Sequence, residues 1–391
     1  MNYRFQLSIS AVSSLVFVLL LNCSYASHQV APGYELGWAN YEIDTKVAKF
    51  PGKIPGKGVG RFYKINDFLN RASARERTGI YITEPYDPDK IPVLFVHGLI
   101  CDPYAWEKMT KRLSRDPVIR ENYQFWYYAY PSATPVIGSA AIFKLHLDTY
   151  IDALKEEHGH SLDRRVVIIG HSMGGILAKS VVSESGAALR DSAFTVPIDQ
   201  LLLSEEKQDL VRKAFVYSPK PHIKKGIFIA APHRGSVIAE ETLGPIGLGL
   251  ADPPDVIEDI IDELRGPKNE EKIQPAFREF LENPVNSIAS LQPSAPISKQ
   301  LADLPVDDAG EVHTLAGKKG KKRSDGIVPL ASTVIGGVFS RVVLDSNHEV
   351  HKLPETSQIV NLILKHNIGL IDNKELRVQS KTIKRLQALD D

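Results

Sequence analysis

Runs of consecutive apolar residues alternate, through the middle of the chain, with stretches whose apolar residues recur at helical spacing. Residues 91–100 and 124–130 are two such runs: the first ends in His-Gly, which suits a buried strand that feeds a tight loop, and the second is aromatic and closes at Pro131. Residues 166–169 are a third, with four β-branched side chains in succession, as in a strand buried on both faces. The residues at helical spacing before this third run are Phe143, Leu147, Tyr150, Ile151 and Leu154.

This alternation of strand and helix predicts a mostly parallel sheet covered by helices on both faces, which is the α/β class. Residues 227–230, 311–315 and 339–344 predict further strands, and residues 355–366 predict the last helix of the domain.

The rhythm of strands stops between about residues 236 and 305, where glycine, proline and acidic amphipathic segments take over. Residues 243–250 are apolar and rich in glycine, while residues 255–264 and 276–281 predict short helices with one apolar side. We interpret this region as an insertion that covers the pocket. A lid that opens and a static helical layer are both compatible with the sequence.

The first residues predict export. Arg4, an apolar run at residues 15–21 and the small residues Ser24 and Ala26 are typical of a secretory signal peptide that ends at residue 26. The apolar stretch is shorter than the ~20 residues of a membrane-spanning helix, so an anchor ranks second. The exported protein is expected to be periplasmic or secreted. A third hypothesis is a bacterial lipoprotein anchored through Cys23, although the Asn before this cysteine departs from the usual box.

Residues 27–90 form a polar, turn-rich segment, interpreted as an N-terminal extension packed on a main domain of residues 91–366, and residues 367–391 are expected to be a C-terminal tail. Cleavage after Ala26 leaves Cys101 without an intramolecular partner, so no disulfide framework is expected. Cys101 is interpreted as a small buried apolar side chain rather than a nucleophile.

Composition excludes several classes of function. The chain has 391 residues, 43% of them hydrophobic and 24% charged, which is ordinary for a globular protein. Lys plus Arg and Asp plus Glu both number 47, so no global charge draws the protein to nucleic acid or to an anionic membrane. No metal-ligand cluster, phosphate-cradling loop or cofactor motif is recognised.

The segment Gly170-His171-Ser172-Met173-Gly174 fits the pattern G-x-S-x-G, in which a serine occupies a strained turn between a strand and a helix. The glycines let the strand and the helix approach closely. The five-residue pattern alone is weak, but here a predicted strand precedes it and apolar residues at helical spacing follow it. Ser172 is therefore the candidate nucleophile of an acyl-transfer site.

Two backbone N–H groups are candidates for an oxyanion hole. In a sheet of this kind one N–H comes from the residue after the nucleophile, Met173, and the other from the loop after an early strand, where Gly98 allows close approach and Leu99 is the candidate donor. His97 in this loop is a possible base, but a side chain that fixes the loop by hydrogen bonding is the preferred interpretation.

A serine hydroxyl needs a histidine to accept its proton and a carboxylate to orient that histidine. Asp325, in a loop after a predicted strand, is the candidate acid, and His348, in the loop after the next strand, is the candidate base. The competing histidines are His351, three residues further on, and His313, inside a predicted strand. Asp345 is the second candidate acid, although its position favours a role in a turn.

Basic residues crowd the approach to Asp325. Such a run is usually a solvated loop, but it also fits an attraction to anionic head groups, which salt-sensitive binding to anionic vesicles would reveal. The residues are Lys318, Lys319, Lys321, Lys322 and Arg323.

Taken together, five segments within residues 91–366 resemble the esterase and lipase branch of the α/β-hydrolase family, particularly bacterial lipase-like proteins and the deacylases of glycosyl-phosphatidylinositol anchors. The segments are Val96-His97-Gly98-Leu99, Gly170-His171-Ser172-Met173-Gly174-Gly175, Ala231-Pro232-His233-Arg234-Gly235-Ser236, Ser324-Asp325-Gly326-Ile327-Val328-Pro329 and Asn347-His348-Glu349-Val350-His351.

The resemblance implies an α/β-hydrolase fold, a triad of Ser172, Asp325 and His348, an oxyanion hole at Leu99 and Met173, and hydrolysis of a carboxylic or lipid ester without a cofactor. Two other functions remain open: transfer of the acyl group to an alcohol acceptor by the same residues, and non-catalytic lipid binding on a hydrolase scaffold. The sequence does not define the acyl chain or the oligomeric state.

Overall fold

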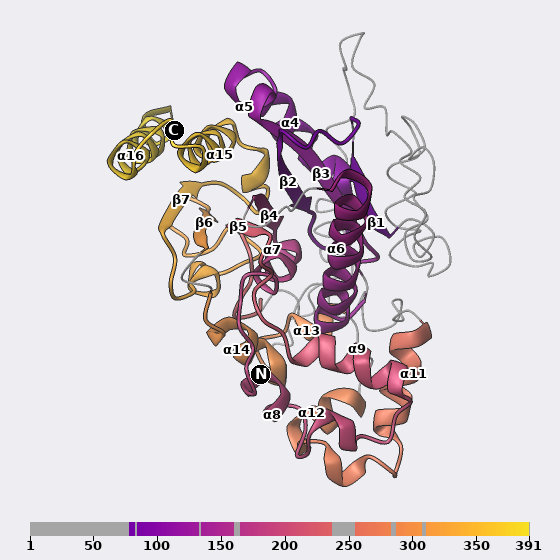
Figure 1. The fold of residues 1–391 in the computed structure, drawn as a ribbon. Helices are drawn as coiled ribbons and strands as arrows, with labels where there is room; N and C mark the ends of the chain where they lie inside the picture. Colours follow the sequence, from indigo (N-terminus) through magenta and orange to yellow (C-terminus); the bar gives the residue numbers. More distant parts are fainter. Residues whose placement is uncertain are drawn as a thin grey trace, which may run out of the picture.

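The computed structural model describes residues 78–82, 84–132, 134–159, 165–236, 255–282, 287–306 and 310–390. Within these ranges seven strands form one sheet in the order β1-β3-β2-β4-β5-β6-β7 (Figure 1). The strands are β1 (Gly79–Ile82), β2 (Ile91–Val96), β3 (Tyr123–Ala129), β4 (Val166–His171), β5 (Ile223–Ile229), β6 (Glu311–Lys318) and β7 (Ser340–Asp345).

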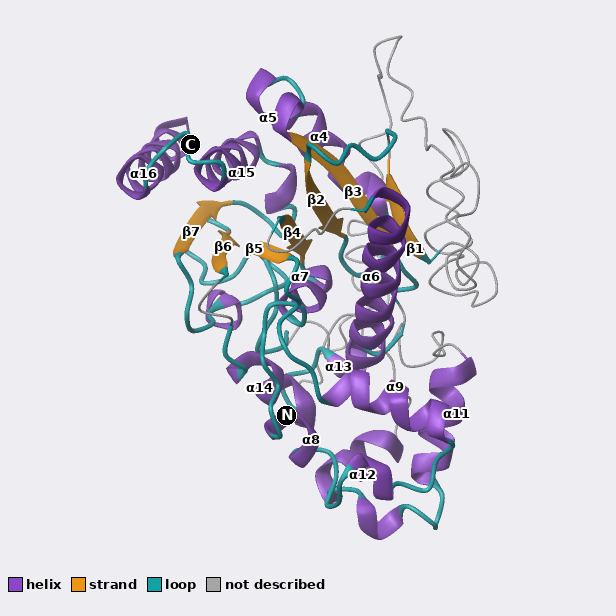
Figure 2. Cartoon of the chain, viewed as in Figure 1, coloured by secondary structure: helices purple, strands orange, loops and turns teal. Residues whose placement is uncertain are grey.

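Helices connect and flank these strands (Figure 2). The α-helices of the described residues are α4 (Glu107–Leu113), α5 (Pro117–Asn122), α6 (Val136–His158), α7 (Met173–Lys179), α8 (Ala188–Asp191), α9 (Glu205–Phe215), α11 (Asp255–Arg265), α12 (Pro275–Glu282), α13 (Ser287–Ser290), α14 (Pro296–Asp303), α15 (Pro354–Asn367) and α16 (Asn373–Asp390). Short 3-10 helices are η1 (Pro103–Trp106), η2 (Ile198–Gln200), η4 (Glu270–Lys272), η5 (Leu330–Thr333) and η6 (Val350–Lys352).

The sheet is parallel except at its first edge, where β1 pairs antiparallel with β3. Every residue of β4 is buried, as its unbroken run of β-branched side chains predicts for a central strand with both faces covered. The predicted fold class, an α/β sheet with helices on both faces, is confirmed, and so are the predicted strands and the helix at residues 355–366.

Two apolar layers cover the two faces of the sheet. On one face α6 and α7 pack against side chains such as Leu94, Ile168 and Phe228. On the other face α4, α5, α15 and α16 pack against alternate side chains of the same strands, such as Phe95 and Ile169. Because successive side chains of a strand point to opposite faces, each strand supplies both layers.

The described structure differs from the expected boundaries at both ends of the domain. β1 lies within the segment interpreted as an N-terminal extension, yet it is a strand of the main sheet. Residues 373–390 of the expected tail form α16, which packs on α15 and β7. The hydrophobic pattern of a four-residue edge strand such as β1, or of a polar helix such as α16, is weak. The elements that they pack against therefore decide whether they belong to the domain.

Several expectations fall outside the described residues: the signal peptide, the hypothesis on Cys23, most of the N-terminal extension and the apolar segment at residues 243–250. In the part of the chain that is described, no helix combines the length and the apolar character needed to cross a membrane.

The region interpreted as a cap is helical where it is described. α11 and α12 match the two short helices predicted from their apolar sides, and with α14 they pack against α8 and α9 around Phe194, Phe215 and Phe277. Figure 1 shows this group of helices at one end of the sheet. Two hydrogen bonds fasten the cap to the domain, because Nζ of Lys179 donates to the carbonyl oxygens of Leu301 and Ala302 at 2.6 and 2.9 Å.

We predict that Gly174→Ala lowers the free energy of unfolding by at least about 3 kcal/mol. A Cβ at residue 174 would lie 2.3 Å from the carbonyl oxygens of Val96 and His97. Neither the strand nor the helix can shift to relieve this overlap without disturbing the core. Chemical denaturation measures the effect. Gly336→Ala is the matched control, since a Cβ at Gly336 meets no atom within 4 Å, and it should change the unfolding free energy by less than about 0.5 kcal/mol. Equal effects of the two substitutions would contradict the prediction.

Candidate active site

Ser172 lies in the turn between β4 and α7, with φ of 53° and ψ of −125°. These angles are unusual for a residue with a side chain, and they are held by the surrounding packing. Its N–H donates to the carbonyl of Ile229 at 2.9 Å, and a Cβ at Gly170 would lie 2.3 Å from the carbonyl oxygen of Gly174. The predicted elbow geometry is therefore confirmed.

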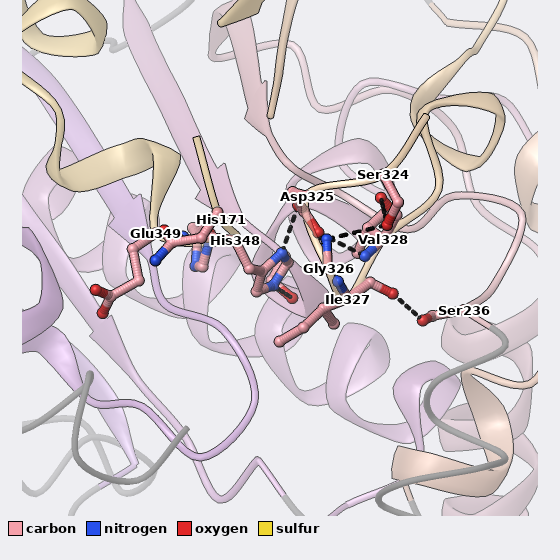
Figure 3. A network of polar contacts seen from close by, with 11 residues as sticks. His171, Ser236, Ser324, Asp325, Gly326, Ile327, Val328, His348 and Glu349 are labelled. Carbon is pink, nitrogen blue, oxygen red and sulfur yellow. Dashed lines mark hydrogen bonds and ion pairs between the residues drawn. The ribbon is translucent and has the colours of Figure 1, made fainter. Parts of the chain in front are cut away.

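His348 follows β7 and lies between Ser172 and Asp325. Its Nε2 is 2.9 Å from Oγ of Ser172. Its Nδ1 is 2.8 Å from Oδ2 of Asp325 (Figure 3). A carboxylate only accepts hydrogen bonds, so Nδ1 carries the proton and Nε2 of the neutral ring accepts from the serine hydroxyl. The structure thus brings together all three side chains that the sequence singled out.

Asp325 is buried, with 2% of its surface exposed, yet both of its oxygens have partners. Oδ1 accepts from the N–H groups of Ile327 and Val328 at 2.8 and 2.7 Å, and Oδ2 accepts from His348. Because burying a carboxyl group is costly unless its oxygens are hydrogen-bonded, this turn of the backbone satisfies Asp325 and keeps it aimed at the imidazole.

The competing histidines lie elsewhere. His351 is buried in η6, and neither of its ring nitrogens has a hydrogen-bond partner among the described residues. His313 lies in β6 and shares a hydrogen bond with Oγ of Ser340 at 2.8 Å. Nδ1 of His97 donates to the carbonyl of Gly98, and its Nε2 accepts from the N–H of Tyr130, so this side chain fixes its loop.

The sequence analysis considered two other residues, Asp345 as the second candidate acid and Cys101 as a buried apolar side chain. Asp345, the last residue of β7, accepts a hydrogen bond from the N–H of Gly320 at 3.0 Å, which ties the loop after β6 to the end of β7. Cys101 forms no disulfide among the described residues and is only half-buried, so it is less enclosed than expected.

The loop after β2 lies directly against the elbow, since a Cβ at Gly98 would be 3.0 Å from Cβ of Ser172. The next residues, Leu99 and Ile100, border the site, and Ile100 has a positive φ of 55°. Outside helices and strands, no backbone hydrogen bond of the described residues uses the N–H of Leu99 or Met173. Among the described residues, these two N–H groups therefore have no backbone acceptor outside helices and strands, at the place where the sequence predicts an oxyanion hole.

One contact of the site was missed from the sequence. Nε2–H of His171 donates to the carbonyl oxygen of His348 at 2.9 Å, and its ring lies against that of His351 with 3.8 Å between centroids. His171 thereby fixes the backbone of the loop that carries His348. The available signal was its place inside the G-x-S-x-G motif, but that position does not define which way a side chain points.

A second missed contact ties the acid loop to the segment after β5. Oγ of Ser236 donates to the carbonyl oxygen of Ile327 at 2.5 Å (Figure 3), and the N–H of Ser236 donates to the carbonyl of Leu291. Ser236 therefore joins the loop of Asp325 to the cap. Its signal was the motif Ala231-Pro232-His233-Arg234-Gly235-Ser236, whose role was not assigned.

Burial lowers the pKa of His171, His233 and His351 well below its usual value, and it lowers the pKa of His313 to about 3. These four rings are therefore neutral at pH 7 and act as packed polar side chains. No group of three His, Cys, Asp or Glu side chains within the described ranges is arranged to hold a metal ion. The basic residues Lys319, Lys321, Lys322 and Arg323 are exposed on the loop before Asp325.

Comparison with known families gives a decisive match. The model of the alpha/beta hydrolase family matches residues 93–352, which include the elbow, the acid loop and His348. The chain belongs to the α/β-hydrolase family. No curated protein matches the sequence.

Solved structures resemble this α/β-hydrolase at low identity. The mature lipase BlEst2 of Bacillus licheniformis is 16% identical, with 73% of this chain and 97% of the lipase covered and a TM-score of 0.41. Phospholipase PlaB of Legionella pneumophila is 15% identical, with 76% of this chain and 64% of the phospholipase covered and a TM-score of 0.45. A thermophilic esterase of Thermogutta terrifontis is 14% identical, with 71% and 90% covered and a TM-score of 0.34. Identities this low concern the fold alone.

We predict that acid destabilises this hydrolase through its buried histidines. In the unfolded chain a histidine has a pKa of about 6.5, so below that pH the unfolded chain binds protons that His171, His233, His313 and His351 exclude in the folded state. The stability is fully present above pH ~6.5 and falls as the pH drops, by up to about 1.4 kcal/mol per pH unit for each histidine. Urea unfolding between pH 7.5 and 5 measures the slope.

His313→Asn tests the origin of that slope, because an amide can keep the hydrogen bond to Ser340 but does not titrate. As the pH falls, the unfolding free energy of the variant should decrease less steeply than that of the parent. The difference in slope should be up to about 1.4 kcal/mol per pH unit, which is the contribution of one proton. A slope that is the same in both proteins would contradict this assignment.

Proposed function

We propose that this α/β-hydrolase is a serine hydrolase that cleaves carboxylic esters, with Ser172 as nucleophile, His348 as general base and Asp325 as the residue that orients the base. The observation that carries the proposal is the unbroken chain of hydrogen bonds from Oγ of Ser172 through both ring nitrogens of His348 to Oδ2 of Asp325, at 2.9 and 2.8 Å. Each link has the donor and the acceptor in the order that proton transfer requires.

In the proposed reaction, Oγ of Ser172 attacks the ester carbonyl carbon while its proton passes to Nε2 of His348. The carbonyl oxygen becomes an oxyanion, for which the N–H groups of Leu99 and Met173 are the proposed donors. His348 then gives the proton to the departing alcohol, which leaves an acyl-enzyme on Ser172. A water molecule attacks this ester in the same way, and the carboxylic acid is released as Ser172 regains its proton.

The surroundings of the three residues support this assignment. Asp325 is held by two backbone N–H groups, and His171 holds the backbone of His348, so the imidazole can change its charge without losing its place. Ser172 is buried, with 8% of its surface exposed, so its position is held by the packing around it. Such preorganisation favours a chemical role over a purely structural one, since a structural serine needs no strained backbone.

A fluorophosphonate probe, which reacts with activated serines, tests the nucleophile. The purified protein should be labelled and should hydrolyse p-nitrophenyl acetate, whereas Ser172→Ala should lose labelling and lose kcat by roughly 10⁶, because no other group can form the acyl-enzyme. Ser183→Ala is the matched control, since Ser183 is also buried and its hydroxyl has no hydrogen-bond partner among the described residues. Absence of labelling in the unmodified protein would favour a non-catalytic lipid-binding role.

We predict that Asp325→Asn lowers kcat by as much as roughly 10⁴. The amide oxygen can still accept from Ile327 and Val328, but its NH₂ would face Nδ1 of His348 and move the ring proton to Nε2, where it blocks the base. Steady-state kinetics measure the loss, and Asp345→Asn should stay within about twofold of the parent, because an amide oxygen at residue 345 can still accept from the N–H of Gly320. Near-normal turnover by Asp325→Asn would assign the role to another acid.

A further inference from the structure

A basic turn, residues 318–323, joins β6 to the acid loop, and the proposed reaction gives it no role. Its basic residues are Lys318, which ends β6, and the exposed Lys319, Lys321, Lys322 and Arg323. β4, β5, β6 and β7 run parallel, so the segments that follow them lie at one edge of the sheet. The basic turn therefore shares this edge with the elbow of Ser172 and the loop of His348.

Hydrogen bonds hold the backbone of the basic turn in one conformation. The N–H of Lys319 donates to the carbonyl of Ser324 at 2.9 Å, and the N–H of Lys322 donates to the carbonyl of Lys319 at 3.0 Å. Gly320 has a positive φ of 54°, and its N–H donates to Asp345 at 3.0 Å. The positive charges are therefore displayed from a folded turn rather than from an extended loop.

A sixth cation and an exposed apolar side chain lie beside the basic turn. The N–H of Leu330 donates to the carbonyl of Arg323 at 2.9 Å. The guanidinium of Arg341, on β7, donates to the carbonyl of Leu330 and to Oγ1 of Thr333, both at 3.2 Å. Arg341 is exposed, and Val334, which follows Thr333, has 43% of its surface exposed. Together with the basic turn, Arg341 and Val334 form the basic surface.

The cations of the basic surface make no ion pair with a carboxylate in the described ranges. Elsewhere on the molecule lysines have such partners: Lys220 pairs with Asp148 and Lys365 pairs with Asp116, each at 2.6 Å. Neighbouring cations without partners repel one another, and an anionic surface placed against them removes that repulsion. The basic surface is thus electrostatically complementary to an extended negative charge.

The negative charge that balances these cations lies in another part of the molecule. The chain has equal numbers of basic and acidic residues, so its formal net charge is zero. α11 carries the exposed carboxylates Asp259, Asp262 and Glu263, and Figure 1 shows α11 well apart from β7. An anionic plane would attract the basic surface and repel α11, so it would bind the molecule in one orientation.

The composition of the basic surface favours lipid head groups over nucleic acid. Most of its cations are lysines, whose ammonium groups are flexible point charges that suit many dispersed phosphates. Residues 318–334 contain no aromatic side chain on which a base could stack. The exposed Val334 offers a small apolar contact of the kind that the head-group region accepts.

We propose that the basic surface docks this hydrolase on the anionic face of a lipid bilayer. Each Lys or Arg near such a face strengthens binding about fivefold, and a group of this size is enough for a stable contact. Docking brings the edge of the sheet that carries Ser172 to the lipid. The proposal concerns binding alone and does not depend on the proposed ester hydrolysis.

Vesicle sedimentation tests the proposal, with Ser172→Ala as the parent protein so that the lipids stay intact. The vesicles are phosphatidylcholine alone, or phosphatidylcholine with about 30% phosphatidylglycerol. The parent should bind the anionic vesicles at least about tenfold more tightly than the neutral ones at about 0.1 M salt, and this preference should disappear at about 1 M salt. Any contribution of the apolar run at residues 15–21 is common to both kinds of vesicle.

Two triple variants with the same change of net charge locate the contact. Replacing Lys321, Lys322 and Arg323 by Gln should weaken binding to anionic vesicles about a hundredfold, or abolish the preference if it is smaller than that. The control replaces by Gln three exposed residues that also make no ion pair in the described ranges, and it should stay within about threefold of the parent. These residues are Arg115, Lys155 and Lys268. Thermal unfolding, measured in parallel, shows that the proteins compared are folded.

Three results would overturn the proposal. The first is equal binding to neutral and anionic vesicles at low salt, and the second is an equal loss in the two triple variants. The third is tighter binding to a DNA duplex than to anionic vesicles at the same salt and phosphate concentration, which would assign the basic surface to nucleic acid. Labelling by the fluorophosphonate is measured separately, so the ester hydrolase stands or falls independently of these results.

Discussion

Close contacts between backbone segments at the elbow fix the position of Ser172 and of the strand and helix on either side of it. Gly174 lies so near the end of β2 that a single added carbon would overlap two carbonyl oxygens, and Gly170 lies equally near the first turn of α7. This contact fixes the helix against the sheet and leaves Ser172 in a backbone conformation that side chains rarely adopt. The strain is tolerated because the strand below is buried on both faces and cannot yield.

A second constraint is the burial of charge beside that strained turn. Asp325 loses its water but gains two backbone N–H groups and an imidazole, so its negative charge is kept where it can orient His348. Next to His348, burial keeps the rings of His171 and His351 neutral. The proposed base therefore lies beside histidines that do not compete for its proton.

The cap is held together in a different way from the sheet. Its helices are short, and they are held to one another mainly by aromatic and aliphatic side chains, among them Phe194, Phe215 and Phe277. Short helices packed on one apolar side leave imperfectly filled space more readily than a two-sided sheet does, and an apolar cavity lies in this part of the fold. Membership of the α/β-hydrolase family describes the sheet and the elbow, while the cap is where a member of the family can differ in substrate.

The sequence by itself determined the elements with strong periodic or compositional signals. Residues 166–169 predicted a buried strand, and the glycines around Ser172 predicted a tight turn between this strand and a helix, so the α/β class and the candidate nucleophile followed. Asp325 and His348 were predicted because each follows a strand, and the ends of parallel strands meet at one edge of a sheet. The tertiary structure decided what depends on side-chain direction across long separations: the contact of His171 with His348, the bond from Ser236 to the acid loop, the place of β1 and α16 in the domain, and the cavity in the cap. Periodicity reports which side of an element is apolar, whereas the partner that covers that side is chosen by packing in three dimensions.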